Sequence, residues 1–379
     1  MLTQDIINYI DSHQKEAFDL LIELAQIPAP SHHEEKRAEF CKNWLAEQGA
    51  KGVYIDDALN VIYPVGCADD KPIAVFMAHS DVVFPDEIPL PLKIEDGKIH
   101  CPGVGDDTAN VMALLMAAKY IAETGISPKE HGILLVVNSC EEGLGNLKGS
   151  RKIVSDFGSR ITEFISFDGG YREIVNRAVG SKRYKVEIDT EGGHSYGAFG
   201  NRNAIAYMAS LIDTLYTIKV PSIGKTTYNV GTISGGTSVN TIAQHAEMLY
   251  EFRSDELEAL NIMEQHFNAA VDFYRTKGID VTVTLVGDRP CSAKVDASRE
   301  EALMHRTQEA VKQHFDFDAA FHAGSTDCNI PLSVGIPAIC VGCVDGRGAH
   351  TREEYIEISS LRPGLGLAFD LILHHFKEK

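Results

Sequence analysis

The sequence lacks the features that would attach it to a membrane or to nucleic acid. None of its 379 residues belongs to an apolar run near the roughly 20 residues that a membrane-spanning helix needs. Basic residues are few, 35 against 54 acidic ones, and the net charge of −19 argues against nucleic acid and anionic membranes as partners. The N-terminal residues lack a basic start followed by an apolar stretch, so we expect no secretory signal and a cytoplasmic location.

Closely spaced cysteine pairs are also scarce. Eight residues are scattered along the chain, and a single C-x-x-C pair occurs at Cys340 and Cys343. A cysteine-rich structural zinc site would need a second pair, which the sequence does not contain. Because the pair lies in the apolar stretch Ala-Ile-Cys-Val-Gly-Cys, we interpret both cysteines as small buried core residues.

Short apolar runs separated by helical stretches dominate the two ends of the sequence. Four such runs lie at residues 73–77, 133–137, 164–167 and 338–341, and a helical stretch spans about 109–123. Runs of this length, bounded by turn residues, are typical of buried strands. We therefore predict an α/β fold with helices flanking a largely parallel sheet. An S-x-x-E pattern at Ser31 and Glu34 predicts a capping box before a further helix.

The middle of the sequence has a different order of elements. Residues from about 181 to 286 predict a strand, a helix, two strands, a helix and a final strand, which is typical of an α+β ferredoxin-like unit. Because the apolar runs resume afterwards, we expect this unit to be an insertion. The predicted domains are therefore one domain formed by residues 1–179 and 291–379, and an inserted domain formed by residues 180–290.

Metal-ligand side chains follow the apolar runs. They are His79 and Asp81, Glu141 and Glu142, Asp168, and His350 after a glycine-rich loop, with the pair Asp106 and Asp107 before the helix at 109. In open α/β sheets the carboxyl ends of the strands form the binding edge, so these groups can meet. Two histidines with several carboxylates suit zinc, cobalt or manganese, and the set is large enough for two ions with a shared carboxylate.

Each motif alone has a simpler explanation. A His-x-Asp pair is more often hydrogen-bonded at a surface, a Glu-Glu pair is usually solvated, and an Asp pair before a helix usually supplies caps. The repeated placement of such groups after apolar strands favours a common site over these explanations.

The order of the motifs resembles the two-zinc peptidase and aminoacylase family, which includes peptidase T, carboxypeptidase G and acetylornithine deacetylase. The motifs M-A-H-S-D-V-V, G-V-G-D-D-T-A-N, C-E-E-G and G-A-H-T-R-E-E-Y carry this resemblance over nearly the whole chain. It implies a zinc-exopeptidase-like catalytic domain. It also implies two divalent ions per subunit, which we expect to be zinc, with cobalt or manganese as alternatives.

The resemblance implies a role for each of these residues. Asp106 would bridge the two metals, His79 and Asp168 would bind one of them, Glu142 and His350 would bind the other, Asp81 would orient His79, and Glu141 would be the general base. Asp106 is preferred to Asp107 on its spacing from the helix. The chain departs from the family pattern after this pair, where Thr108-Ala109-Asn110 replaces the usual Lys-Gly-Gly.

The resemblance extends to the inserted domain, which would be a lid through which family members dimerise. It implies that His194 reaches the active site of the partner subunit, where it would stabilise an oxyanion. It also implies substrate contacts for Asn240, Arg253 and the segment Gly324-Ser325-Thr326, although Arg253 could equally be a solvated surface arginine. We therefore expect a homodimer.

The substrate class follows from the residue at position 168. In the family that the chain resembles, aspartate at this position accompanies the aminopeptidase members. The run Phe167-Asp168-Gly169-Gly170 resembles the corresponding run of peptidase T. We predict an aminopeptidase of short peptides. The alternatives are a deacylase of N-acyl amino acids or a carboxypeptidase of the same family, and, less favoured because every ligand position and Glu141 are present, a catalytically inactive metal-binding homologue.

Overall fold

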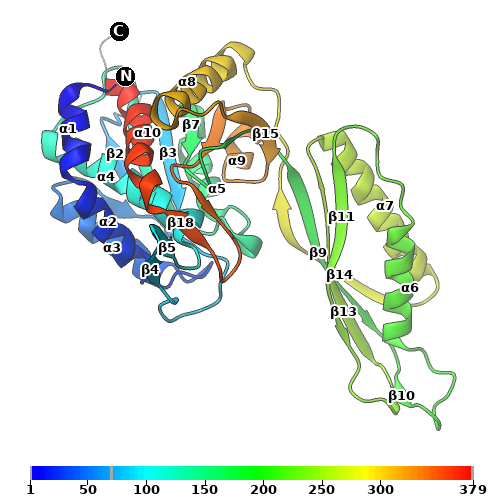
Figure 1. Cartoon of the computed structure of the whole chain (residues 1–379). Coiled ribbons are helices and arrows are strands. Elements are labelled where there is room, and N and C mark those ends of the chain that lie inside the picture. The colour runs from blue at the N-terminus through cyan, green and yellow to red at the C-terminus, as the bar shows by residue number, and fades with distance from the viewer. Residues whose placement is uncertain (1, 69–70, 377–379) are drawn as a thin grey trace. The chain divides into compact units, whose positions relative to one another are not determined.

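The computed structural model describes residues 2–68 and 71–376, which form two compact units (Figure 1). The first unit combines Met1–Ala178 with Ala293–Lys379, and the second is Val179–Ser292. None of the helices within these described ranges is long and apolar enough to cross a membrane.

The first unit is built on an eight-stranded sheet. Its strand order is β1-β2-β6-β3-β7-β16-β8-β15. The four central strands run parallel to one another: β6 (Gly132–Asn138), β3 (Ile73–His79), β7 (Ile161–Ser166) and β16 (Ala338–Val341). The outer strands are β1 (Tyr54–Ile55), β2 (Val61–Val65), β8 (Glu173–Ala178) and β15 (Ala320–Gly324). Because β2 and β8 are antiparallel to their inner neighbours, the sheet is largely but not wholly parallel, which confirms the predicted fold class.

Both faces of this sheet are covered, which explains the unbroken apolar runs of its central strands. Every residue of β3 is buried, and its residues alternate between two apolar clusters. Ala74 and Phe76 pack in the cluster that includes α4 and α10, whereas Val75 and Met77 pack with residues of α5 and α9. The helices of this unit are α1 (Gln4–Ser12), α2 (Gln14–Ala25), α3 (Glu35–Glu47), α4 (Ala109–Thr124), α5 (Lys148–Phe157), α8 (Ala297–Phe315), α9 (Asn329–Ser333) and α10 (Leu361–Leu373).

A second, smaller sheet of the first unit has the order β17-β18-β5-β4. Its strands are β17 (Gly346–Arg347), β18 (Tyr355–Glu357), β5 (Lys98–His100) and β4 (Lys93–Glu95). All neighbouring strands in it are antiparallel. Ile99 and Ile356, which are opposite each other in the register, are both fully buried, so one face of the small sheet packs on the core.

The predicted capping box at Ser31 and Glu34 is wrong. Helix α3 begins at Glu35, and no side chain caps its N-terminus. The Ser31 hydroxyl instead donates to Asp81 at 2.7 Å, and the Glu34 carboxylate accepts from the amide of Cys140 at 2.9 Å. Bonds to distant segments have therefore replaced the local pairing that the sequence pattern predicts. The interpretation of Cys340 and Cys343 is correct, since both are buried and all eight cysteines are free thiols.

The second unit is a four-stranded antiparallel sheet with two helices. The strand order is β11-β13-β9-β14, the order of a ferredoxin-like unit. The elements are β9 (Gly180–Asp189), α6 (Ala204–Tyr216), β11 (Thr226–Gly235), β13 (His245–Ser254), α7 (Leu257–Thr276) and β14 (Asp280–Arg289). Burial alternates along β13, because both helices pack on one face of the sheet. A short ribbon of β10 (Gly193–His194) and β12 (Thr241–Ile242) lies at one end of this unit (Figure 1).

Candidate active site

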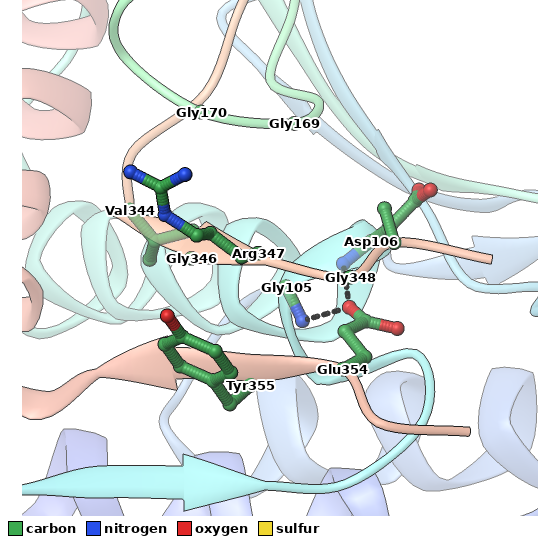
Figure 2. A pocket seen from close by; sticks show the side chains of 11 residues that line it. Gly105, Asp106, Gly169, Gly170, Val344, Gly346, Arg347, Gly348, Glu354 and Tyr355 are labelled. Carbon is green, nitrogen blue, oxygen red and sulfur yellow. Dashed lines mark hydrogen bonds between the residues drawn. The ribbon is translucent and has the colours of Figure 1, made fainter. Parts of the chain in front are cut away.

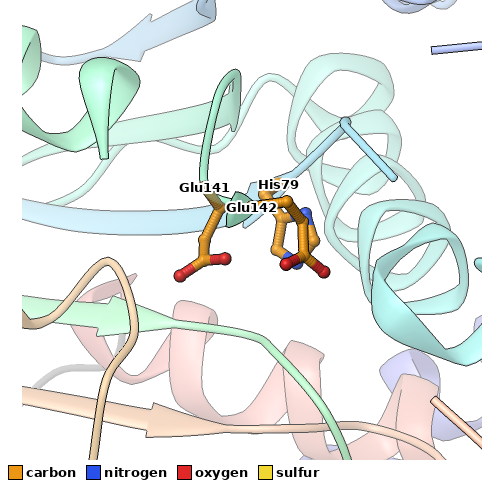
Figure 3. Close-up of side chains that lie close together, drawn as sticks. All are labelled: His79, Glu141 and Glu142. Atoms are coloured by element: carbon orange, nitrogen blue, oxygen red, sulfur yellow. The ribbon is translucent and has the colours of Figure 1, made fainter. Parts of the chain in front are cut away.

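The carboxyl ends of adjacent parallel strands bring His79 together with Glu141 and Glu142. His79 is the last residue of β3 and is opposite Asn138, the last residue of β6. Ligand-type atoms of the three side chains lie within 4.8 Å of one another, and all three residues are buried (Figure 3). This is the strand-end arrangement that the sequence predicts.

Two groups of side chains meet at Asp106. His79 Nε2 lies 3.1 Å from Asp106 Oδ1 and 3.8 Å from Asp168 Oδ1. His350 Nε2 lies 3.0 Å from Asp106 Oδ2 and 3.0 Å from Glu142 Oε1. Each group of three has its ligand atoms within 4.8 Å of one another. The two carboxylate oxygens of Asp106 therefore face different histidines, which is the geometry that a shared ligand between two cations requires. We call these five residues, together with Glu141, the acidic edge.

The charges of the acidic edge fit divalent cations. In the part of the chain that the structure describes, only histidines form ion pairs with Asp106, Glu142 and Asp168. Hydrogen bonds to Asp106 and Glu142 raise the pKa of His350 to about 10, and burial raises the pKa of Glu142. Three carboxylates without lysine or arginine partners are a donor set that favours hard or borderline metals such as zinc and manganese.

Asp107 has a different environment from Asp106, although a cis peptide bond joins them. Its carboxylate is fully buried and accepts from the amide of His79 at 2.8 Å and from the side chain of Asn110 at 2.6 Å. Burial raises the pKa of Asp107 well above its usual range. For Asp106, burial opposes ionisation, but hydrogen bonds from His350 and His79 outweigh it and lower the pKa. Asp106 is thus the member of the pair that faces both histidines.

Asp81 supports both His79 and the turn that carries Glu141. His79 Nδ1 lies 3.0 Å from the main-chain oxygen of Asp81 and 3.5 Å from its carboxylate. The two carboxylate oxygens accept from the amides of Glu141 at 2.9 Å and Glu142 at 3.0 Å. The carboxylate contributes to the orientation of His79 less directly than the main-chain oxygen, and it fixes the backbone of the general-base candidate.

Glu34 extends this support by one residue. It accepts from the amide of Cys140 at 2.9 Å, so three successive amides of the turn, at Cys140, Glu141 and Glu142, are bound by the carboxylates of Glu34 and Asp81. The sequence pattern predicts a helix-capping role for Glu34 and not a place at the site. The S-x-x-E spacing alone contains no signal for a contact with residue 140.

Asn110 connects three segments that carry predicted ligands. Its side-chain amide donates to Asp107 at 2.6 Å and to the main-chain oxygen of Gly169 at 3.0 Å, and its side-chain oxygen accepts from the amide of Cys343 at 2.7 Å. These segments precede or follow Asp106, Asp168 and His350. The departure from Lys-Gly-Gly distinguishes Asn110 in the sequence. This departure does not predict which residues Asn110 contacts.

Glu354 connects the His350 loop to the Asp106 turn. Its buried carboxylate accepts from the amides of Gly103 at 2.5 Å, Gly105 at 2.8 Å and Asp106 at 2.9 Å. Burial raises the pKa of Glu354 to about 7. The residue belongs to the motif G-A-H-T-R-E-E-Y, which marks the region but does not identify this glutamate.

The segment Gly324-Ser325-Thr326 begins at the last residue of β15, in the same unit. The next residue, Asp327, accepts a hydrogen bond of 2.6 Å from Asn138 at the end of β6. Thr326 is buried, and its hydroxyl accepts from the amide of Cys328 at 3.2 Å. The hydrogen bond between Asp327 and Asn138 therefore fixes this segment near the strand ends that carry the acidic edge.

The other predicted substrate residues lie in the second unit. His194 and Asn240 are neighbours there, because β10 pairs with β12 and Ser195 donates its amide to the main-chain oxygen of Asn240 at 2.9 Å. His194 Nδ1 accepts from the amides of Tyr196 and Gly197, both at 3.2 Å. We call residues 193–200 and 236–242 the tip of the second unit.

Arg253 lies on β13, away from the tip in sequence. Its guanidinium donates to both carboxylate oxygens of Glu251, at 3.0 and 3.1 Å. This partner in the same unit agrees with the alternative of a surface arginine, and the contact of Arg253 with substrate stays a prediction.

Comparisons with known proteins agree with the motifs. Residues 75–374 match the family described as Peptidase family M20/M25/M40. A putative succinyl-diaminopimelate desuccinylase of Mycobacterium tuberculosis is 23% identical, over 92% of this chain and 96% of that protein. Solved structures of a Staphylococcus aureus tripeptidase (TM-score 0.77) and of aminopeptidase PepT of Bacillus cereus (TM-score 0.70) are each 22% identical, and each comparison covers 96% of this chain and 99% of the other.

Proposed function

The chain belongs to peptidase family M20/M25/M40, whose members are metal-dependent hydrolases of peptide and amide bonds, and we propose that it is a two-zinc aminopeptidase of short peptides. The observation that carries this proposal is the position of Asp106 between two groups of ligand atoms, His79 with Asp168 and Glu142 with His350. Asp106 would be the bridging ligand. Cobalt or manganese are the alternative metals.

The chemistry divides between the metals and the chain's own residues. Two divalent ions held by the acidic edge would polarise the scissile carbonyl and lower the pKa of the attacking water. Glu141 is buried beside these ligands, and its backbone is fixed by Asp81. Its carboxylate would accept the proton of the attacking water and deliver it to the leaving amine.

The second unit would supply the remaining group as a lid. We propose that the predicted domain of residues 180–290 is this lid and that two subunits pair through it. Strand β11 supports this, because it is an edge strand whose residues are mostly exposed and whose free side could pair with another strand. His194 of one subunit would then donate a hydrogen bond to the oxyanion formed in the other.

Two substrate classes have support. The similarity in fold to a tripeptidase and to an aminopeptidase, together with Asp168, favours cleavage of a residue from the N-terminus of short peptides. The sequence similarity to a putative desuccinylase supports removal of an acyl group from an N-acyl amino acid as the second candidate. Asn240 and the segment 324–326 would contact either substrate.

A panel of substrates tests the choice between these classes. The zinc-loaded protein is incubated with dipeptides, tripeptides and N-acetyl amino acids, and the products are identified by mass spectrometry. We expect free N-terminal residues from tripeptides. Exclusive hydrolysis of N-acetyl amino acids would instead support the deacylase.

The bridging role is tested by counting metals. Asp106→Ala should lose both ions, whereas Asp107→Ala should retain more metal, because the Asp107 carboxylate accepts from the backbone amide of His79 and from the side chain of Asn110. If Asp107→Ala loses both ions and Asp106→Ala does not, the bridge has been assigned to the wrong residue.

A further inference from the structure

A pocket of about 140 Å³ lies beside Asp106 in the first unit (Figure 2). Much of its wall is main chain, because Gly105, Gly169, Gly170, Gly346 and Gly348 line it. At roughly 30 Å³ per water molecule, its volume corresponds to about four or five waters. The pocket therefore has room for a short side chain.

Two polar side chains reach this pocket from neighbouring strands. Arg347 of β17 is directly opposite Tyr355 of β18 in the antiparallel register. Side chains of directly opposed residues lie on the same face of a sheet. Figure 2 shows the guanidinium of Arg347 and the hydroxyl of Tyr355 projecting to the same side of the ribbon. Both groups can donate hydrogen bonds to one ligand.

The guanidinium of Arg347 is the unpaired charge of this pocket. Arg347 is exposed and forms no hydrogen bond or ion pair with any residue that the structure describes. The acidic groups nearby have other partners. Asp106 faces the two histidines, Glu354 accepts three backbone amides, and Asp345 pairs with Arg172 at 2.6 Å.

We propose that this pocket binds the carboxylate of an acidic substrate residue next to the scissile bond, with Arg347 as the specificity-determining residue. An arginine fork matches a carboxylate with two parallel hydrogen bonds, and Tyr355 supplies a further donor. The placement next to the scissile bond follows from Asp106, which lines the pocket and also belongs to the acidic edge. The inference rests on the proposed peptidase function and adds to it a preference for peptides that begin with glutamate or aspartate.

The test compares isosteric substrates. We measure kcat/KM of the zinc-loaded protein for Glu-Ala-Ala and Gln-Ala-Ala, which differ only in the charged oxygen. Wild type should prefer the glutamate peptide by about tenfold or more, the size expected for a charge-assisted hydrogen bond. Arg347→Gln should reduce this ratio to about one, and Arg347→Lys should restore part of it. Tyr355→Phe should reduce it less than Arg347→Gln does.

Arg352 provides the matched control. It is an arginine of the same loop region, but its guanidinium is paired with Asp86 at 2.6 Å. Arg352→Gln should leave the ratio as in wild type. If wild type cleaves both peptides without preference, or if Arg347→Gln keeps the preference, the inference is overturned while the peptidase function stands.

A binding measurement covers the case in which neither peptide is cleaved and the peptidase proposal fails. Glutarate and its monoamide are titrated into zinc-loaded wild type and Arg347→Gln by calorimetry. Tighter binding of glutarate than of the monoamide in wild type alone supports the carboxylate pocket. Equal binding of the two compounds by wild type, or the same preference in both proteins, overturns it.

Discussion

The acidic edge and the tip of the second unit are built in opposite ways. At the acidic edge, every predicted residue except His350 is at least partly buried, and carboxylates or amides of distant segments hold the backbone around it. At the tip, Tyr196, Phe199 and Val239 expose 89%, 90% and 101% of their surface. The first region is complete within its own unit, whereas the second presents large apolar side chains to water.

This difference indicates how the two regions act. A buried, cross-linked edge holds its groups before any substrate arrives, which is what a reaction centre needs. Contiguous exposed apolar side chains are typical of a surface that another molecule covers during function. We therefore expect substitutions at the acidic edge to act within one subunit, and substitutions at the tip to act through a second one.

The largest effect is expected for Glu141→Gln. The variant removes the proton acceptor but keeps the shape, so kcat should fall about a hundredfold to ten-thousandfold. Both metals should remain bound, because Glu141 is not one of the five proposed ligands. Metal content by plasma emission and kcat on the best tripeptide are the measurements. Glu142→Gln is the matched comparison and should lose metal. Metal loss in Glu141→Gln, or retained activity, would contradict the assignment of the base.

The role of the tip is tested by the variant His194→Ala. If His194 donates to the oxyanion, kcat should fall about a hundredfold or more. Metal content and the proposed dimer should be unchanged, since the described hydrogen bonds of the His194 side chain go only to amides of its own turn.

Subunit exchange then distinguishes the two ways in which His194 could act. A heterodimer of His194→Ala with Glu141→Gln has one site with an intact Glu141 and an intact His194 from the other chain. Recovered activity supports action across the dimer. Heterodimers verified by mass spectrometry that stay inactive would show that the histidine acts within its own chain or is only structural.

A smaller effect is expected for Asn110→Ala, which removes all three bonds between the segments of Asp107, Gly169 and Cys343. Residues that orient metal ligands typically contribute tenfold to a hundredfold to metal affinity. We expect a loss of that size in competition titrations with a zinc chelator. The control is Asn203→Ala in the second unit, where Asn203 caps helix α6. It should lower the unfolding free energy by about 1 kcal/mol and leave zinc affinity unchanged. Equal zinc affinity of Asn110→Ala and wild type would show that Asn110 does not position the metal ligands.

The sequence predicts the residues of the acidic edge better than the residues that hold them in place. His79, Glu142 and Asp168 follow apolar strands, and strand ends of a parallel sheet meet by topology, so their proximity could be foreseen. Glu34 and Asn110 act through bonds to residues far away in the sequence, and no periodicity encodes such partners. The same reason made the capping box at Ser31 wrong, because a local pattern cannot show that a distant carboxylate competes for the hydroxyl.

The smallest effect is expected for Ser31→Ala, which tests the residue that was wrongly predicted to cap a helix. Its hydroxyl donates to Asp81 at 2.7 Å, and Asp81 in turn binds the amides of Glu141 and Glu142. Losing one hydrogen bond to a buried carboxylate should lower the unfolding free energy by about 1–3 kcal/mol. Because the two amide bonds to Asp81 remain, kcat/KM should fall less than tenfold, with metal content unchanged. Ser12→Ala is the control, since that hydroxyl bonds only within or next to helix α1 and should leave kcat/KM as it is. If Ser31→Ala matches Ser12→Ala in kcat/KM, Ser31 contributes to folding alone, and the support of the Glu141 turn ends at Asp81 and Glu34.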